Sequence, residues 1–269
     1  MGLLDELRVA PGTAPELGRR DPDGRVGAAD KHAGLRRLEG LVERLGVLHN
    51  RLYAEATRSV LVVLQGMDAA GKDGTIRSVL TGVNPQGCRV ESFKAPSGKE
   101  LLHDYLWRIH KLCPERGEIA IFNRSHYEDV VAVRVRGLAD SDVWRRRYEH
   151  IRSFERMLTD EGTAVMKVFL HLSRDEQRAR LLERLENPEK RWKFRAGDLD
   201  DRARWDDFTA AYEDALRETS TEWAPWYVVP SDHNWSRNLA VAEILVATLE
   251  HLDPRLPEPD PGIEAMSIT

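Results

Sequence analysis

The segment from Val60 to Gly74 constrains the fold of this chain more than any other. Val60-Leu61-Val62-Val63-Leu64 is a continuous apolar run, and the glycine-rich stretch Gly66-Met67-Asp68-Ala69-Ala70-Gly71-Lys72-Asp73-Gly74 follows it at once. A short apolar run that ends in such a turn and leads into helical sequence is typical of a strand buried on both faces of a parallel sheet. The segment therefore predicts a buried strand, a tight loop and a helix.

Four more strands are expected after this one, over residues 89–93, 119–122, 165–172 and 226–229. Helical sequence separates neighbouring strands, which is the alternation of a layered α/β domain. An amphipathic helix from Leu35 to about Ala56 precedes the first strand, and a terminal helix is expected from Val241 to Leu252. We predict a three-layer α/β fold with a five-stranded parallel sheet and helices on both faces.

The chain of 269 residues is long enough for one large domain with appendages. Residues 1–33 are rich in Gly, Pro and charge, so they predict an extended arm that wraps the domain or a neighbouring subunit. The main domain is expected over residues 34–252, and a proline-rich tail over residues 253–269.

Composition excludes several classes of protein. No run of about 18 apolar residues suggests a membrane span, and acidic residues stand where a signal peptide carries basic ones, so a cytoplasmic location is expected. The net charge of −5 argues against a general nucleic-acid binder, which needs a basic surface. Cys88 and Cys113 fit neither a metal knuckle nor a redox pair and are expected to be buried thiols.

The glycine-rich loop has the spacing of a phosphate-binding loop. Gly66, Gly71 and Gly74 allow backbone angles at which consecutive amides converge on an anion, and Lys72 supplies a charge to the terminal phosphates. A mere tight turn is the alternative, but a tight turn has no need of the lysine.

The loop departs from the common pattern after the lysine. Asp73 stands where a Ser or Thr usually ligates magnesium, so another group must hold the metal. Asp68 lies within the loop, where phosphates would repel its carboxylate unless a divalent cation or an acceptor proton lay between them. Asp68 is therefore a candidate metal ligand; the alternative is that it caps the following helix.

A second constellation, Phe122-Asn123-Arg124-Ser125-His126-Tyr127-Glu128-Asp129, follows the third strand. Ligands of doubly wound sheets bind beyond the carboxyl ends of the strands, so this segment should face the phosphate loop. Arg124 could clamp a phosphoryl oxygen with its planar fork. His126 could be catalytic or merely packed.

A third constellation is a basic, flap-like segment. Arg180 and Arg184 are four residues apart on one helical face and could point at the same anion, although a solvated charged helix is the alternative. Trp192 is expected to pin the segment while Lys190 and Lys193 stay free to bind phosphate.

Four motifs together resemble the type-2 polyphosphate kinases: Gln65 to Gly74, Asn84-Pro85-Gln86-Gly87, Phe122 to Glu128, and Lys190-Arg191-Trp192-Lys193. The similarity runs from about residue 30 to about residue 252, and the first and third motifs are specific to that family. The resemblance implies a P-loop kinase fold similar to thymidylate kinase, with a helical lid over about residues 173–205. It also implies in-line phosphoryl transfer between inorganic polyphosphate and a purine nucleotide, AMP or ADP (or GMP or GDP).

The resemblance implies roles for matching residues. Asp68 would bind Mg²⁺ or Mn²⁺ and orient the acceptor phosphate, while Lys72 and Arg124 would hold the transferred group. Many members carry Asp where this chain has Asn123 and Asn where it has Glu128. The pair present here resembles the subgroup that acts on both nucleoside mono- and diphosphates, with Glu128 replacing the lost metal contact.

The expected catalytic residues are therefore Asp68, Lys72, Asn123, Arg124 and Glu128. Further residues are expected to bind the substrates. Phosphate binding is expected from Gly66, Ala69, Ala70, Gly71, Lys72, Asp73 and Gly74 in the loop and from Arg180, Arg184, Lys190 and Lys193 in the lid. Nucleotide binding is expected from Lys94, Tyr127 and Arg134. The resemblance also suggests a homodimer or homotetramer.

Two other functions compete with this one. An ATP-dependent nucleoside monophosphate kinase would share the core but need a base pocket for its donor. A non-catalytic nucleotide sensor would keep Lys72 but tolerate loss of Asp68 and of the lid charges. A regulatory GTPase is disfavoured further, because the chain contains no Asn-Lys-x-Asp sequence for reading guanine.

Overall fold

The structure is a computed structural model that describes residues 2–263 and 266. Its centre is a six-stranded sheet in the order β1-β6-β5-β2-β4-β3. The strands are β1 (Arg8–Val9), β2 (Ser59–Gly66), β3 (Cys88–Ser92), β4 (Ile119–Asn123), β5 (Thr163–His171) and β6 (Trp226–Pro230). All neighbouring pairs are parallel except β1 and β6.

The sheet corrects the expected strand count from five to six. The additional strand, β1, pairs antiparallel with β6 through Arg8 and Val9. Two residues are too few to show the alternation by which a strand is recognised in a sequence, so β1 could not be predicted. The other five strands lie where the sequence predicts them, within two residues at each end.

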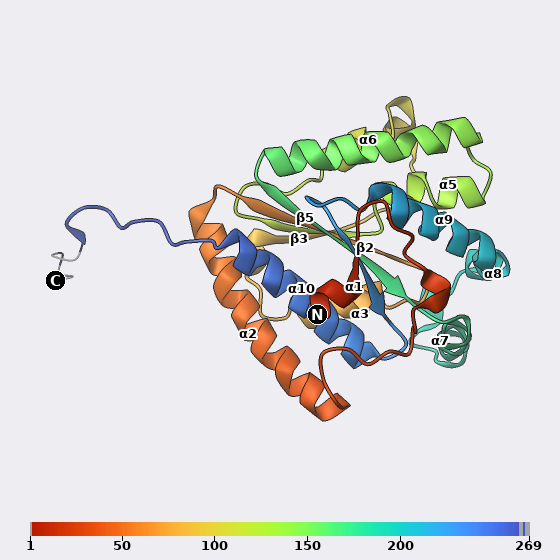
Figure 1. Ribbon diagram of the computed structural model, residues 1–269, viewed down its shortest axis with the longest axis horizontal. Helices are drawn as coiled ribbons and strands as arrows, with labels where there is room; N and C mark the ends of the chain where they lie inside the picture. Colours follow the sequence, from red (N-terminus) through yellow and green to blue (C-terminus); the bar gives the residue numbers. More distant parts are fainter. Residues whose placement is uncertain (1, 264–265, 267–269) are drawn as a thin grey trace.

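Helices cover both faces of the sheet (Figure 1). On one face, α2 (Lys31–Glu55) packs beside α10 (Asn234–Leu252), with α3 (Lys72–Val79) nearby. On the other face lie α6 (Ser141–Asp160), α9 (Trp205–Thr219) and α5 (Ala132–Val135). The expected three-layer α/β architecture is confirmed.

The strand β2 shows how the sequence produces these layers. All eight of its residues are buried. Val60, Val62 and Leu64 belong to the core under α2 and α10, whereas Leu61 and Val63 belong to the core under α6 and α9. Alternate side chains of a strand point to opposite faces, so an uninterrupted apolar run is required where both faces are covered.

The shorter elements complete the fold. They are α1 (Leu3–Leu7), α4 (Trp107–His110), α7 (Arg174–Glu186) and α8 (Ala196–Ala203), with 3₁₀ turns at Leu17–Arg19 (η1), Pro85–Gly87 (η2), Gly98–Leu102 (η3), His126–Asp129 (η4) and Arg191–Lys193 (η5). The helices α8 and α9 are separated by a break at Arg204. The terminal helix α10 starts at Asn234, seven residues before the expected start.

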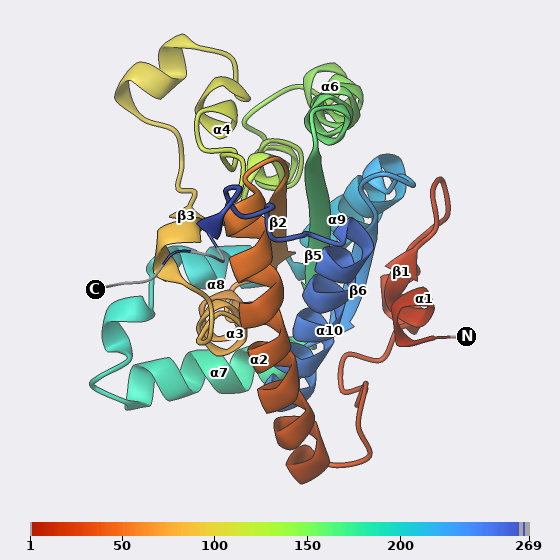
Figure 2. The same ribbon diagram turned by 90° about the vertical axis from the view of Figure 1, so that its left-hand side faces the viewer.

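The N-terminal segment packs on its own chain. Its apolar side chains Leu7, Val9, Leu17 and Val26 are buried, and Figure 2 shows α1 and β1 lying against the β6 side of the sheet. Residues 253–263 leave the end of α10 and run away from the body (Figure 1). Residues 1, 264–265 and 267–269 of the expected arm and tail lie outside the described residues.

Two further findings bear on the sequence-based expectations. Cys88 and Cys113 are free but only half-buried, not fully buried as expected. No helix in the described part of the chain combines the length and apolar character needed to cross a membrane.

Candidate active site

The phosphate loop lies at the point where the sheet reverses its strand order. The chain leaves β2, the strand between β5 and β4, and continues through α3 to β3 on the far side of β4. The crevice outside the carboxyl ends of β2 and β4 is the usual ligand site of such sheets. The loop 67–71 follows β2, and the turn that begins at Arg124 follows β4. The two predicted constellations are therefore neighbours, as expected.

The loop has the backbone of an anion cradle. Gly66 has φ +153°, and a Cβ there would lie 2.9 Å from the Leu170 carbonyl oxygen. Gly71, which caps α3, has φ +100°, and Ala69 has φ +65° despite its side chain. Left-handed residues followed by a helix start turn successive N–H groups to one side, where phosphate binds.

Lys72 lies against the loop it belongs to. Its Nζ donates hydrogen bonds to the carbonyls of Gly66 at 2.8 Å and Met67 at 3.3 Å, and only 8% of the residue is exposed. Burial, reinforced by the charge of Arg124, lowers the pKa of Lys72 to about 8. The Lys72 ammonium is therefore bound only by neutral backbone carbonyls in the structure, and a phosphate anion could replace them.

Arg124 joins the two candidate metal ligands. It forms an ion pair with Asp68 through Nη2, and its Nη1 lies 3.4 Å from Glu128 Oε2. Burial alone would raise the pKa of Asp68, but Arg124 and Lys72 hold it below its ordinary value. Arg124 itself has φ +62°, which is unusual for a side-chain-bearing residue. Two carboxylates and two cations thus meet at one point, from the loop and the turn.

Asn123 and Asp73 contact each other. The Asn123 Nδ2 donates to Asp73 Oδ1 at 2.7 Å, which links the end of β4 to the first turn of α3. Asp73 is the unusual residue after the loop lysine, and Asn123 is the unusual residue at the strand end. An aspartate at position 123 would place its carboxylate against that of Asp73, and the two charges would repel each other. The amide of Asn123 avoids this repulsion and donates a hydrogen bond to Asp73 instead.

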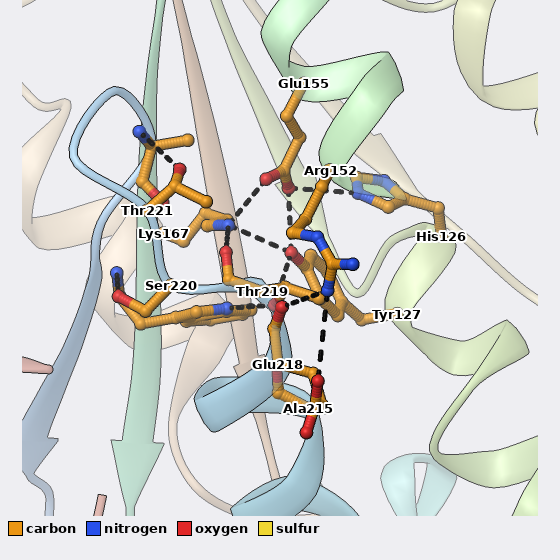
Figure 3. Close-up of polar contacts among 12 residues, drawn as sticks. His126, Tyr127, Arg152, Glu155, Lys167, Ala215, Glu218, Thr219, Ser220 and Thr221 are labelled. Carbon is orange, nitrogen blue, oxygen red and sulfur yellow. Dashed lines mark hydrogen bonds and ion pairs between the residues drawn. The ribbon is translucent and has the colours of Figure 1, made fainter. Parts of the chain in front are cut away.

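The turn after Arg124 is anchored from behind by a buried polar cluster (Figure 3). Lys167 of β5 lies 2.5 Å from Glu155 of α6, and both are fully buried. The Tyr127 hydroxyl donates to Glu155 at 2.8 Å and accepts from Lys167 at 3.0 Å, and His126 Nε2 lies 3.4 Å from Glu155. Lys167 also donates to the Thr219 carbonyl at 2.7 Å.

This cluster decides the roles of two residues of the turn. His126 is fully buried, so of the two alternatives it is the packed histidine. Tyr127 is 1% exposed and its hydroxyl is turned into the cluster, so the expected nucleotide contact from Tyr127 is wrong in this structure. Its aromatic ring made it resemble a ligand contact, but the turn directs that ring inward.

The other two residues that were expected to contact the nucleotide, Arg134 and Lys94, lie in different parts of the molecule. Arg134 lies on α5, where its Nη1 is 2.6 Å from Asp214 of α9 and its guanidinium stacks over the ring of Trp144 at 4.6 Å. These contacts hold Arg134 between helices instead of turning it toward the loop. Lys94 is exposed just after β3, and its carbonyl accepts a hydrogen bond from Arg108.

Two arginines of the segment expected to form the lid, Arg180 and Arg184, contact different parts of the molecule. Arg180 donates to the Ala69 carbonyl at 3.0 Å and to the Ser231 and Asp232 carbonyls at 2.7 and 2.9 Å, so it braces the loop. Arg184 lies 3.4 Å from Asp198 of α8, and its charge also lowers the pKa of Asp68.

The outer part of the segment expected to form the lid is open to solvent. Lys190 pairs with Glu183, and Lys193 lies over the Trp192 ring at 5.2 Å. Trp192 is 76% exposed, so the expectation that it pins this segment is wrong. A tryptophan next to lysines resembles an anchor in the sequence, but no core lies beneath this one.

Two arginines near the site, Arg136 and Arg237, were not predicted from the sequence. Arg136 pairs with Asp201 at 2.6 Å, and its charge acts on both Asp68 and Glu128. Arg237 of α10 is 1% exposed and donates to the Ala70 carbonyl of the loop at 3.2 Å. Neither belongs to a motif; Arg237 precedes the start that was expected for its helix.

The fold and this site define a P-loop phosphotransferase. A phosphate loop with its lysine follows the central strand of a parallel sheet, and an arginine flanked by two carboxylates faces it from the next strand. Such an arrangement supplies positioning and charge neutralisation, which are what phosphoryl transfer requires of a protein.

Comparison with known proteins gives the family. The family described as Polyphosphate kinase 2 (PPK2) matches residues 28–257. An "AMP/ADP-polyphosphate phosphotransferase" from Meiothermus ruber is 57% identical over 98% of this chain and 100% of its own length. An "ADP-polyphosphate phosphotransferase" from Rhodopseudomonas palustris is 49% identical over 84% of this chain and 82% of its own.

The solved structures agree. The crystal structure of Polyphosphate Kinase 2 from Arthrobacter aurescens TC1 is 41% identical, covers 98% of this chain and 95% of its own, and superposes with a TM-score of 0.94. The chain belongs to the polyphosphate kinase 2 family.

Proposed function

We propose that this enzyme transfers phosphoryl groups between inorganic polyphosphate and both AMP and ADP. The observation that carries the proposal is the placement of Arg124 between Asp68 and Glu128, beside Lys72 of the phosphate loop. The high identity to a relative named for AMP and ADP supports the choice of acceptors.

The side chains of the site suit an in-line transfer without a protein nucleophile. Lys72 and the loop amides would bind oxygens of the phosphoryl group, and Arg124 would clamp the same group from the β4 side. The gain comes from holding donor and acceptor phosphates in line while neutralising their charge. Asp68 would orient the acceptor from within the loop.

We further propose that Asp68 and Glu128 hold Mg²⁺ together with substrate phosphates. Both are carboxylates with hard oxygen donors, and they lie on either side of one guanidinium. Within residues 2–263 and 266, no three His, Cys, Asp or Glu side chains gather into a cluster that could hold a metal ion. A pair of carboxylates nevertheless fits magnesium, which usually keeps several waters and takes its other ligands from phosphate. The ion would neutralise charge on the phosphates; Mn²⁺ should substitute.

A cavity beside the catalytic turn is our candidate site for the nucleoside. It has a volume of about 430 Å³, and Asp129, which directly follows Glu128, lines it together with Tyr105 and the arginines Arg108, Arg146 and Arg147. An aromatic ring with cations around it suits a nucleotide. Arg146→Ala should raise the Michaelis constant for AMP at least about threefold. Arg145→Ala, which removes a cation stacked on Trp144 outside the cavity, is the matched control.

The decisive experiment is a product assay. Purified protein is incubated with AMP, Mg²⁺ and either long-chain polyphosphate or ATP, and the nucleotides are separated by chromatography. ADP followed by ATP should form with polyphosphate. Turnover with ATP alone as donor would favour the nucleoside monophosphate kinase instead, and binding without turnover would favour a sensor. Light scattering on the same preparation tests the expected homodimer or homotetramer.

A further inference from the structure

Arg237 lies directly behind the phosphate loop. Its Nη1 donates to the Ala70 carbonyl at 3.2 Å and to Asn234 Oδ1 at 2.7 Å, and its Nε donates to the Thr75 hydroxyl of α3 at 2.7 Å. A Cβ placed on Gly71 would lie 2.0 Å from the same Nη1. The guanidinium is therefore in contact with the loop backbone at Ala70 and Gly71, directly before the first residue of α3.

The charge of Arg237 has no carboxylate partner. Within the described part of the chain, no Asp or Glu lies within ion-pair distance of it, and its hydrogen bonds go to carbonyl, hydroxyl and amide oxygens. The buried Lys167, by contrast, is paired with Glu155, and the buried Arg108 lies 3.8 Å from Asp129.

A buried cation without a counter-ion is costly to the folded protein. Burial, together with the charge of nearby Arg180, lowers the pKa of Arg237 to about 9, yet the group remains charged at neutral pH. A cation here stabilises an anion on the opposite side of the loop, because the field of a buried charge is weakly screened. The cost to the free protein would thus be recovered when phosphate binds.

We propose that Arg237 is an electrostatic positioning residue of the phosphate site, whose counter-charge is the phosphate bound on the other side of the loop. The inference rests on the proposed function only in that the loop binds phosphate. Arg237 does not touch the substrate; it acts through the Ala70 and Gly71 backbone. If it were only a brace, its hydrogen bonds would matter and its charge would not.

The test compares three variants by titration calorimetry with inorganic tripolyphosphate and by thermal unfolding with and without that ligand. Arg237→Gln removes the charge and keeps a donor for the loop, and Arg237→Lys keeps the charge. Arg44→Gln is the matched control. Arg44 of α2 pairs at 2.9 Å with Glu250 of α10, the helix that carries Arg237. Glu250 lies 13 residues after Arg237, and so about 20 Å further along α10.

Arg237→Gln should raise the dissociation constant for tripolyphosphate at least about tenfold, while the melting temperature of the free protein stays the same or rises. The stabilisation by saturating ligand should shrink accordingly, since it depends on the ratio of ligand to dissociation constant. Arg237→Lys should stay within about threefold of the wild type, and Arg44→Gln should not change binding.

Unchanged binding in Arg237→Gln with a lowered melting temperature would show a brace and overturn the inference. If Arg237→Gln does not fold, Arg237→Lys decides alone: it keeps the charge but loses the forked contact with Ala70 and Thr75, so a tenfold loss of affinity in that variant overturns the inference. Failure of the wild type to bind tripolyphosphate would contradict the proposed function itself, which separates the two failures.

Discussion

The buried pair of Glu155 and Lys167 should control the stability and the activity of this enzyme together. Both side chains are fully buried, 2.5 Å apart. Removing one partner, by Glu155→Gln or Lys167→Met, leaves the other charge buried, which typically costs about 3–5 kcal/mol. The double variant removes both charges, and its main loss is the hydrogen bond that Lys167 donates to the Thr219 carbonyl, about 1–3 kcal/mol.

The expected coupling follows from these values. The two single losses sum to about 6–10 kcal/mol, so the double variant should be more stable than additivity predicts by at least about 3 kcal/mol. Urea unfolding of the four proteins at pH 7, followed by circular dichroism, measures this coupling. Burial alone would raise the pKa of Glu155, but Lys167 and His126 hold it below its ordinary value. This contribution is therefore complete above the unfolded pKa of the carboxyl and is lost as pH falls through the folded one.

The functional consequence reaches the site through the turn. His126 and Tyr127 contact Glu155, and Arg124 and Glu128 flank them in the chain. At a temperature where every variant is folded, we expect kcat to fall at least tenfold in each single variant, about 1.4 kcal/mol, with smaller changes in the Michaelis constants. Additive stabilities, or full kcat in Lys167→Met, would refute the claim that this pair positions the turn.

Four other predictions concern the phosphate site and the lid. Asp68→Asn should fold normally yet lose more than tenfold in kcat, about 1.4 kcal/mol, and a smaller loss would contradict its metal role. The ammonium of Lys72 is lost as pH rises through its pKa of about 8, so between about pH 7 and pH 8.5, below the pKa of about 9 of Arg237, tripolyphosphate binding should weaken in the wild type but stay level in Lys72→Arg. Lys190→Ala and Lys193→Ala should raise the Michaelis constant for polyphosphate more than that for AMP; the opposite order would remove them from the polyphosphate channel. Glu128→Asn should lower kcat/KM for AMP at least tenfold relative to ADP, about 1.4 kcal/mol, because a monophosphate recruits less metal by itself; an equal fall for both would refute a selective role.

The sequence predicted those parts of the fold and site that depend on local pattern. The loop 66–74 is recognised by its glycines and its lysine, and the turn at Arg124 by its charged residues. Both follow strands of the parallel sheet, and ligands bind beyond the carboxyl ends of such strands, so the two segments were predicted to lie side by side. Five strands were found for the same reason, since apolar runs with turns between them are local signals.

What the sequence missed depends on tertiary contacts. Tyr127 resembled a ligand contact, but only the packing of α6 and β5 shows that its hydroxyl is needed by Glu155 and Lys167. Trp192 resembled an anchor, but the exposure of a side chain is set by what lies beneath it. Arg237 stands in a stretch whose helical character was not recognised, and a cation that acts from behind a loop has no motif.

The contact between Asp73 and Asn123 explains why the loop can depart from the common pattern. A Ser or Thr after the loop lysine usually ligates magnesium, and in this chain that position is an aspartate bonded to Asn123 at 2.7 Å. A single change to Asp at position 123 would set two carboxylates against each other, whereas the amide donates to Asp73 and ties β4 to α3. The two departures are thus one structural unit, which leaves Asp68 and Glu128 as the carboxylates beside Arg124. Asn123→Asp should accordingly weaken the link between strand and helix, and Asp73→Asn in the same chain should relieve the repulsion, so the double variant should be more stable than Asn123→Asp alone.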